Sequence, residues 1–242
     1  MQKLLSFYLV VFIANIIQCI TGFAGTVLAM PFSIMLVGYP TAKPILNILA
    51  LTASVGVLAR HYKDVDKSEF FKIVVIMSIG IGGGMFLAPH IQTNPDLIHK
   101  ILGVVVVLFA VYNAVMFWRK KEVEPNKVLS FILLVAAGLI HGLFVCGGPL
   151  LVTYASSKIK DTKQFRATIS AVWIVLNSII LVMDIRNGYF TPQLIPNITI
   201  CMVLLLLAMV VGEKLARRLS KNAFMIISYF LMFDSGITLF LD

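Results

Sequence analysis

Long apolar stretches, separated by short polar and basic links, account for almost the whole chain. They cover residues 4–38, 44–60, 70–88, 97–118, 128–157, 167–184, 194–213 and 222–241. All except the first and the fifth have the roughly 17–25 residues that cross the hydrocarbon core of a bilayer once. The pattern predicts an all-α integral membrane protein with six transmembrane helices at those ranges.

Two of the stretches are too long for a single crossing. As continuous helices, 4–38 and 128–157 would reach roughly 52 and 45 Å, against a hydrocarbon core of about 30 Å. Each contains a break, TGFAGTVLAMP at 21–31 and CGGP at 146–149. We predict that each stretch is a re-entrant helical hairpin with its tip inside the membrane, where irregular backbone survives only if protein or a cavity surrounds it. Whether a hairpin also crosses the membrane fully stays open.

Composition and charge agree with a membrane protein. Apolar residues make up 60% of the chain and charged residues 13%, whereas soluble domains have about 45–50% apolar and about 25% charged residues. The mean hydropathy is +0.96. The net charge of +9 comes largely from basic clusters at 60–72, 119–127, 158–166 and 214–221. Basic residues in short loops mark the cytoplasmic side. The charge therefore indicates topology and not a nucleic-acid partner.

The clusters also predict how the chain is threaded. The stretch 128–157 is flanked by basic clusters on both sides, so it should begin and end in the cytoplasm. The 60–72 cluster then places the link around Lys43 outside, together with both termini, and every Lys and Arg is expected in or beside a loop. Each half, 1–122 and 123–242, would hold one hairpin and three helices in opposite orientation, the inverted repeat of secondary transporters. Only five identities support the repeat directly, at an offset of 120 residues.

The two breaks also resemble a known family. TGFAGTVLAMPFSIMLVGYPTAKP and HGLFVCGGPLLVTYASSKIKDTKQFRAT are similar to the paired signatures of the TauE/SafE family of sulfite and organosulfonate exporters and permeases. The resemblance covers nearly the whole chain, although many members carry a denser glycine cluster in the first half. It implies transport of a small anion, often a sulfur oxyanion, a sulfonate or a carboxylate.

The chemistry of a helix break independently favours an anion. A helix that begins after a break has N–H groups without partners and about half a positive charge at its start. Pro149 suits a first helical position, and Pro31 is expected to play the same part in the other half. The two helix starts are predicted to meet at the bilayer centre. The predicted substrate-binding residues are Thr21, Gly22, Gly25, Thr26, His141, Cys146, Gly147, Gly148 and Pro149.

Several of these residues have a second interpretation. The break glycines either open the backbone to the anion or allow close helix packing, and the run Gly80–Pro89 is interpreted as packing and a helix end. His141 either binds substrate, carries a proton or is hydrogen-bonded within the bundle. Asp234, inside the last stretch, either accepts a coupling proton or lies near the outer interface. Further polar residues could line a path or bond between helices: Asn15, Gln18, Asn47, Thr52, Ser54, Ser170, Asn177 and Ser178.

Taken together, these features predict a secondary transporter of a small anion in a bacterial-type plasma membrane. An embedded enzyme is not expected, because HExxH, GxSxG and paired intramembrane aspartates are missing from the sequence, and the cysteines lack metal-binding spacing. No cofactor and no metal are implied. A passive anion channel or a non-transporting scaffold would share the topology without requiring two opposed breaks. The expected partners are the small anion and the lipid bilayer, while a homo-oligomer, the transport direction and the coupling ion stay open.

Overall fold

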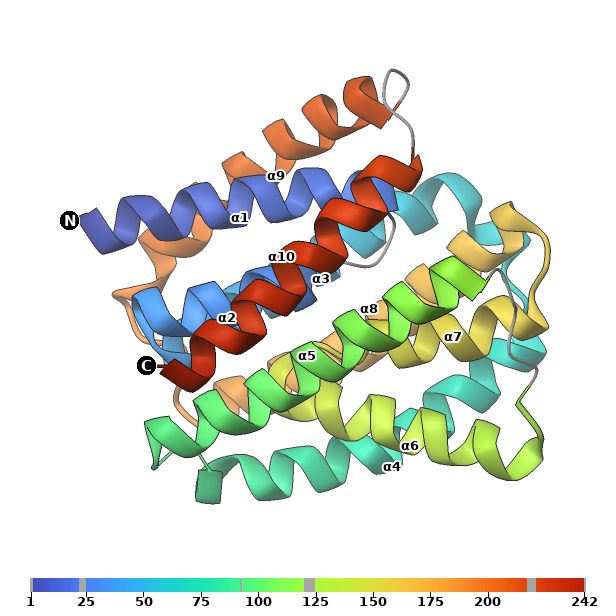
Figure 1. Ribbon diagram of the computed structural model, residues 1–242, viewed down its shortest axis with the longest axis horizontal. Coiled ribbons are helices and arrows are strands. Elements are labelled where there is room, and N and C mark those ends of the chain that lie inside the picture. The colour runs from blue at the N-terminus through green and yellow to red at the C-terminus, as the bar shows by residue number, and fades with distance from the viewer. Residues whose placement is uncertain (1, 22–24, 92, 120–124, 217–220, 242) are drawn as a thin grey trace. The chain divides into compact units, whose positions relative to one another are not determined.

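The structure is a computed structural model of the chain, and it describes residues 2–21, 25–91, 93–119, 125–216 and 221–241 (Figure 1). Within these ranges it contains ten α-helices, one short 3-10 helix (η1, Tyr62–Asp64) and no strand. The predicted all-α class is confirmed. The α-helices are α1 (Gln2–Thr21), α2 (Gly25–Val37), α3 (Tyr39–His61), α4 (Lys67–Ile91), α5 (Pro95–Arg119), α6 (Lys127–Phe144), α7 (Gly148–Lys158), α8 (Thr162–Arg186), α9 (Leu194–Ala216) and α10 (Lys221–Leu241).

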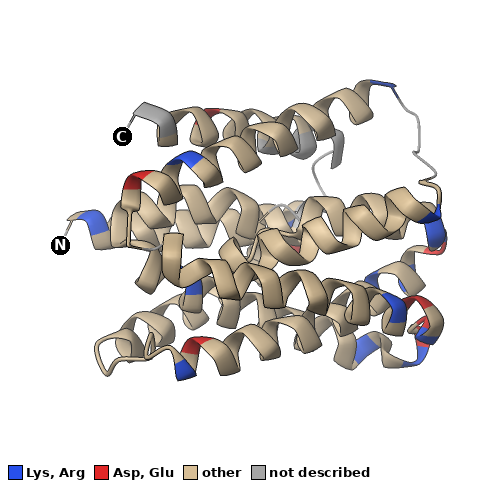
Figure 2. Cartoon of the chain, turned by 90° about the horizontal axis from the view of Figure 1, so that it is seen from below, with Lys and Arg blue, Asp and Glu red and all other residues tan. Residues whose placement is uncertain are grey.

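A helix lies at each of the six stretches that were predicted to cross once, namely α3, α4, α5, α8, α9 and α10. In the described part of the chain, seven helices are long and apolar enough to cross a membrane: α1, α3, α4, α5, α6, α8 and α9. Lys, Arg, Asp and Glu lie mainly towards helix ends, which leaves the helix middles apolar (Figure 2). The chain is therefore a multi-pass membrane protein.

Each long stretch is divided into one long and one short helix, as the breaks predicted. Gly25 opens α2 and Gly148 opens α7, which have 13 and 11 residues. Pro149 follows directly at the start of α7, where a missing N–H costs nothing. The expectation for Pro31 was wrong, because α2 already begins at Gly25 and Pro31 lies in the helix interior. The path of these hairpins in the membrane stays a prediction.

Lys43 lies inside a helix and not in a link. Gly38 alone joins α2 to α3: its φ of +77° is left-handed, and its N–H donates to the carbonyl oxygen of Ile34 at 2.8 Å. A new helix starts immediately at Tyr39, so Lys43 falls in its second turn. Lys43 has no exposed surface, and its Nζ lies 5.8 Å from the centre of the Tyr39 ring. The expectation that every basic residue lies in or beside a loop was wrong for Lys43. Its polar neighbours suggested a link of several residues, whereas Gly38 alone connects the two helices.

The order of helix lengths recurs along the chain. A long helix, a short one and three long ones make up α1 to α5, and the same order describes α6 to α10 (Figure 1). The starts of α2 and α3, at 25 and 39, recur 123 residues later as the starts of α7 and α8, at 148 and 162. This spacing differs from the offset of 120 read from identities. The recurrence fits an internal repeat, whose inversion in the membrane stays a prediction.

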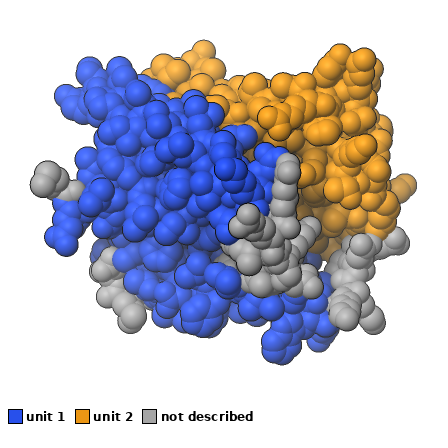
Figure 3. Space-filling view, turned by 90° about the horizontal axis from the view of Figure 1, so that it is seen from above, with its two compact units in different colours: residues 1–46, 89–121, 190–242 blue, residues 47–88, 122–189 orange. Residues whose placement is uncertain are grey.

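The contacts within the chain define two compact units (Figure 3). Unit 1 consists of residues 1–46, 89–121 and 190–242, and unit 2 of residues 47–88 and 122–189. Each unit takes segments from both predicted halves. The compact units therefore do not coincide with the predicted repeats 1–122 and 123–242. These repeats stay a prediction.

Unit 1 is held together by helices that approach each other closely. In it, α1 packs against α9 and α2, while α10 packs against α5. The Tyr8 hydroxyl of α1 donates to Oδ1 of Asn197 in α9 at 2.7 Å. A Cβ added at Gly212 of α9 would lie 2.7 Å from the Cβ of Cys19. Small residues thus set the distance between these two helices.

In unit 2, α4 and α6 pack with their backbones in contact. The contact is lined by glycines four residues apart on each helix, Gly80, Gly84, Gly138 and Gly142. A Cβ at any of them would crowd backbone atoms of the other helix, for example the Ile81 carbonyl oxygen at 2.8 Å from a Cβ at Gly142. Gly82 and Gly83, by contrast, have nothing within 4 Å of an added Cβ. The interpretation of the Gly80–Pro89 run as packing is confirmed for its two inward glycines.

Candidate functional site

The second break begins at a valine. Val145 has φ 57° and ψ 24°, and its N–H donates to the carbonyl oxygen of His141 at 2.8 Å, which ends α6. Left-handed backbone is strained for a β-branched residue and persists only where the surroundings enforce it. Val145 is buried. The sequence pointed to Gly-Gly-Pro, but the left-handed turn lies just before these residues.

The glycines at the two breaks have a packing role. Gly147 has φ −68° and ψ −3°, which any residue can adopt. A Cβ there would overlap the carbonyl oxygen of Ala137 and lie 2.8 Å from the Cβ of His141, so the start of α7 rests directly on α6. In unit 1, a Cβ at Gly25 would overlap the side chain of Gln18. The packing interpretation is therefore confirmed for Gly147 and Gly25.

The start of α7 is a buried helix N-terminus. Gly148 and Pro149 are both buried, and the N–H of Leu151 is bonded to the carbonyl oxygen of Gly147 at 3.2 Å. Because they stand at the start of α7, the backbone N–H groups of Gly148 and Leu150 have no carbonyl acceptor within the helix. Together with the helix dipole, they make this end attractive to an anion.

Three buried polar side chains from three helices meet next to this helix start. Nε2 of His141 in α6 donates to Oδ1 of Asn177 in α8 at 3.0 Å, since an amide oxygen only accepts. Nδ2 of Asn47 in α3 donates to the backbone carbonyl oxygen of Asn177 at 3.0 Å. The His141 ring packs on Trp173, with 4.6 Å between centroids. The interpretation of His141 as a residue hydrogen-bonded within the bundle is confirmed.

Two atoms of this cluster have no hydrogen-bond partner among the described residues, Nδ2 of Asn177 and Oδ1 of Asn47. Both side chains are 0% exposed. Leaving a buried amide unsatisfied costs about 1–3 kcal/mol. A buried donor and a buried acceptor in one cluster mark a place where a polar ligand would form hydrogen bonds. The sequence offered both asparagines only as two of eight polar residues on apolar segments.

The remaining predicted residues lie in different parts of the structure. Cys146 is buried between α6 and α7, and Thr26 is the half-buried second residue of α2. Thr21 ends α1, and Gly22 lies outside the described residues. The first-break residues belong to unit 1 and the second-break residues to unit 2. The predicted meeting of the two breaks therefore stays a prediction.

Asp234 lies on the surface of its helix. Its side chain is exposed on α10, and its backbone carbonyl oxygen accepts from Oγ1 of Thr238 at 2.9 Å. Both the interface position and the coupling role of Asp234 stay predictions. Within the described ranges, no group of three His, Cys, Asp or Glu side chains could hold a metal ion.

Comparison with known proteins decides the family. A family model described as "Sulfite exporter TauE/SafE" matches residues 7–239. The chain belongs to this family. The match spans nearly the whole chain and confirms the resemblance seen in the two break signatures. TauE/SafE membership supports a membrane transporter of an anion and fits a protein that is not an enzyme. No curated protein and no solved structure matches the chain.

Proposed function

We propose that this TauE/SafE protein is a secondary transporter of a small anion such as a sulfur oxyanion, a sulfonate or a carboxylate. In this proposal, the start of α7 and the cluster of Asn47, His141 and Asn177 form part of the anion site. The observation that carries it is the fully buried amide nitrogen of Asn177, which has no partner among the described residues.

Hydrogen-bond donors suffice to hold an anion in such a place. Oδ1 of Asn177 accepts from His141, so His141 orients the amide and directs Nδ2 elsewhere. Nδ2 and the first N–H groups of α7 would then donate to the oxygens of a sulfonate or carboxylate. Hydrogen bonds to a charged partner are stronger than neutral ones, and apolar surroundings strengthen them further.

The membrane topology and the cellular location belong to the same proposal. We infer an inverted repeat with two re-entrant hairpins, both termini outside and a bacterial-type plasma membrane as the location. The recurrence of helix starts 123 residues apart supports the repeat. With 13 and 11 residues, α2 and α7 reach only roughly 20 and 16 Å, which is too short for a crossing.

Solute counterflow in proteoliposomes tests the transport proposal. Vesicles are loaded with excess unlabelled sulfite, thiosulfate, methanesulfonate or acetate, and a trace of the same anion, labelled, is added outside. A carrier exchanges the two, so the label should rise transiently above its equilibrium level for at least one anion. Uptake without an overshoot would indicate a passive channel instead of a carrier. No uptake of any anion would favour a non-transporting scaffold.

A further inference from the structure

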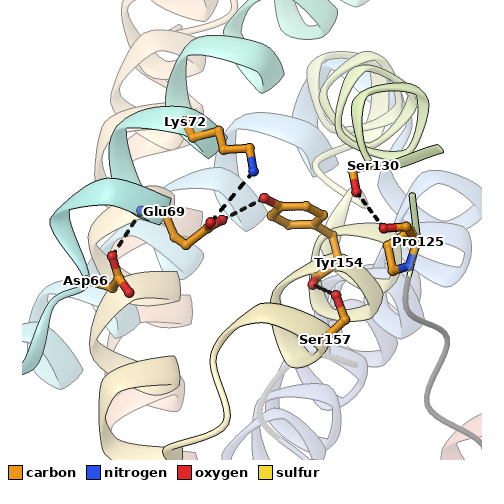
Figure 4. Close-up of polar contacts among 7 residues, drawn as sticks. All are labelled: Asp66, Glu69, Lys72, Pro125, Ser130, Tyr154 and Ser157. Carbon is orange, nitrogen blue, oxygen red and sulfur yellow. Dashed lines mark hydrogen bonds and ion pairs between the residues drawn. The ribbon is translucent and has the colours of Figure 1, made fainter. Parts of the chain in front are cut away.

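A carboxylate of α4 holds the middle of α7 (Figure 4). The Tyr154 hydroxyl donates to Oε2 of Glu69 at 2.6 Å, and Nζ of Lys72 lies 3.6 Å from Oε1 of the same carboxylate. The Lys72 ammonium also lies 5.3 Å from the centre of the Tyr154 ring. Tyr154 is 0% exposed within the apolar core of unit 2. Its hydroxyl therefore links that core to Glu69, whose side chain is 19% exposed and open to protons from water.

The start of α4 is fixed in place around Glu69. Oδ1 of Asp66 accepts from the backbone N–H of Glu69 at 3.0 Å and caps the helix (Figure 4). The backbone N–H of Asp66 in turn donates to Oγ1 of Thr168 in α8 at 2.9 Å. Among the described contacts of Glu69, the ionisable groups are Tyr154 from α7, Lys72 from its own helix and Asp66 at the cap. The neutral Thr168 hydroxyl of α8 is bonded to Asp66. In these contacts, α4 and α7 are joined by the hydrogen bond from Tyr154 to the Glu69 carboxylate and by the Lys72 ammonium over the Tyr154 ring.

Besides its side chains Leu151, Tyr154 and Ala155 in the apolar core of unit 2, α7 has two specific anchors. At its start, Gly147 rests on the α6 backbone at Ala137. Further along, Tyr154 is bonded to Glu69. Because α7 has only 11 residues, we expect a shift of its middle to reach its start. Losing the second anchor would shift the break residues at its start, including Gly148.

We propose that Glu69 is a proton-sensitive positioning residue that holds α7, and with it the candidate anion site, through Tyr154. When ionised, Glu69 keeps Tyr154 in place and the start of α7 ordered. When protonated, it loses its attraction to Lys72 and becomes a weaker acceptor, since hydrogen bonds to an ionised group are roughly twice as strong as neutral ones. The effect on anions rests on the proposed function, whereas the effect on α7 does not.

Cys146 is a native reporter of the break, because it is 0% exposed and lies between α6 and α7. Cys19 and Cys201 are replaced by alanine, and the rate at which dithiodipyridine modifies Cys146 is measured. Glu69→Gln, Tyr154→Phe, the double variant and Asp96→Asn are each compared with the parent at the same pH, so the intrinsic reactivity of the thiol cancels. Asp96 is the matched control, an exposed acid in the first turn of α5.

At about pH 8, Glu69→Gln and Tyr154→Phe should each react about tenfold faster than the parent, the ratio expected for one lost charged hydrogen bond. The double variant should be no faster than either single one. At about pH 4, the ratios should fall towards one, because a protonated Glu69 is a weaker acceptor in the parent as well. Asp96→Asn should match the parent throughout. Tyr154→Phe keeps the core volume, so it separates the hydrogen bond from a loss of folding. Equal rates for the parent and all variants at both pH values would overturn the proposal.

A second measurement connects the anchor to anion binding. Methanesulfonate keeps its charge over this pH range, so its ligand-induced thermal shift reports on the protein alone. The parent should bind it more weakly at the acid pH, and Glu69→Gln should bind weakly at both. If the parent shows no response to any anion, the proposed function fails and the Cys146 rates still decide the anchor. If methanesulfonate binds the parent and Glu69→Gln equally at both pH values, Glu69 does not position the anion site.

Discussion

At the scale of single residues, neighbours at the second break have different tasks. Val145 takes the left-handed turn, Gly147 lets α7 rest on α6, and His141 orients the amide of Asn177. A Gly147→Ala change would disturb packing and would therefore say little about binding. The side chain that separates binding from packing is Asn177, whose Nδ2 has no partner among the described residues.

Asn177→Leu should weaken anion binding, at a cost of about 1–3 kcal/mol in stability because buried His141 loses its acceptor. It removes the buried donor while keeping the volume, and the backbone carbonyl oxygen that accepts from Asn47 stays. Because a hydrogen bond to a charged group contributes about 1.5–3 kcal/mol, affinity should fall about ten- to a hundredfold. Ligand-induced thermal shifts measure it. Ser178→Ala is the matched control, since Oγ of Ser178 bonds within its own helix, to Ile174 at 2.7 Å. Unchanged affinity in Asn177→Leu would move the anion site away from this cluster.

At the scale of elements, the scaffold of the site is the contact between α4 and α6. Glycines at four-residue spacing on both helices let the backbones meet. Since α6 carries His141 and supports the start of α7, this contact indirectly sets the position of the candidate site. Between the two inward glycines of α4, Gly80 and Gly84, lie Gly82 and Gly83, where an added Cβ would have nothing within 4 Å.

Gly84→Ala and Gly83→Ala should therefore differ sharply in stability. A methyl group at Gly84 would overlap the carbonyl oxygen of Leu139, and such overpacking typically costs about 1–3 kcal/mol. A methyl group at Gly83 meets open space, and alanine is the better helix former by up to about 1 kcal/mol. Thermal unfolding in detergent should show a lower midpoint for Gly84→Ala and an unchanged or higher one for Gly83→Ala. Equal midpoints would show that the glycine contact does not limit the packing of α4 on α6.

At the scale of the whole molecule, the recurring order of helices and the two compact units divide the chain at different residues. The order of helix lengths recurs along the sequence, with two pairs of helix starts 123 residues apart. At that spacing Gly25 corresponds to Gly148, and Gln18, which packs on Gly25, corresponds to His141. Each compact unit nevertheless draws segments from both halves.

The threading of the chain is tested by cysteine labelling in intact cells. In a protein without its native cysteines, Lys3→Cys should react with an impermeant thiol reagent from outside. Lys127→Cys and Lys160→Cys, at the two ends of the second hairpin, should stay protected until the membrane is opened, because both lie in basic clusters. If these two positions are labelled from opposite sides, α6 with α7 crosses the membrane and the inverted repeat is lost.

The sequence by itself determined the all-α class, the positions of the six long helices, both breaks and the family. These features are local, because apolar length, glycine and proline act within a few residues of chain. The same local information indicated that the Gly80–Pro89 run packs, but it could not say which of its glycines face α6.

Only the tertiary structure decided the parts that carry the proposed mechanism. Asn47 meets Asn177 across 130 positions of sequence, and Tyr154 meets Glu69 across 85. Hydropathy also could not reveal that Lys43 is fully buried or that the turn falls on Val145. Whether a polar side chain is hydrogen-bonded, unsatisfied or exposed depends on which distant helices fold against it, and that pairing is not contained in the pattern of any single segment.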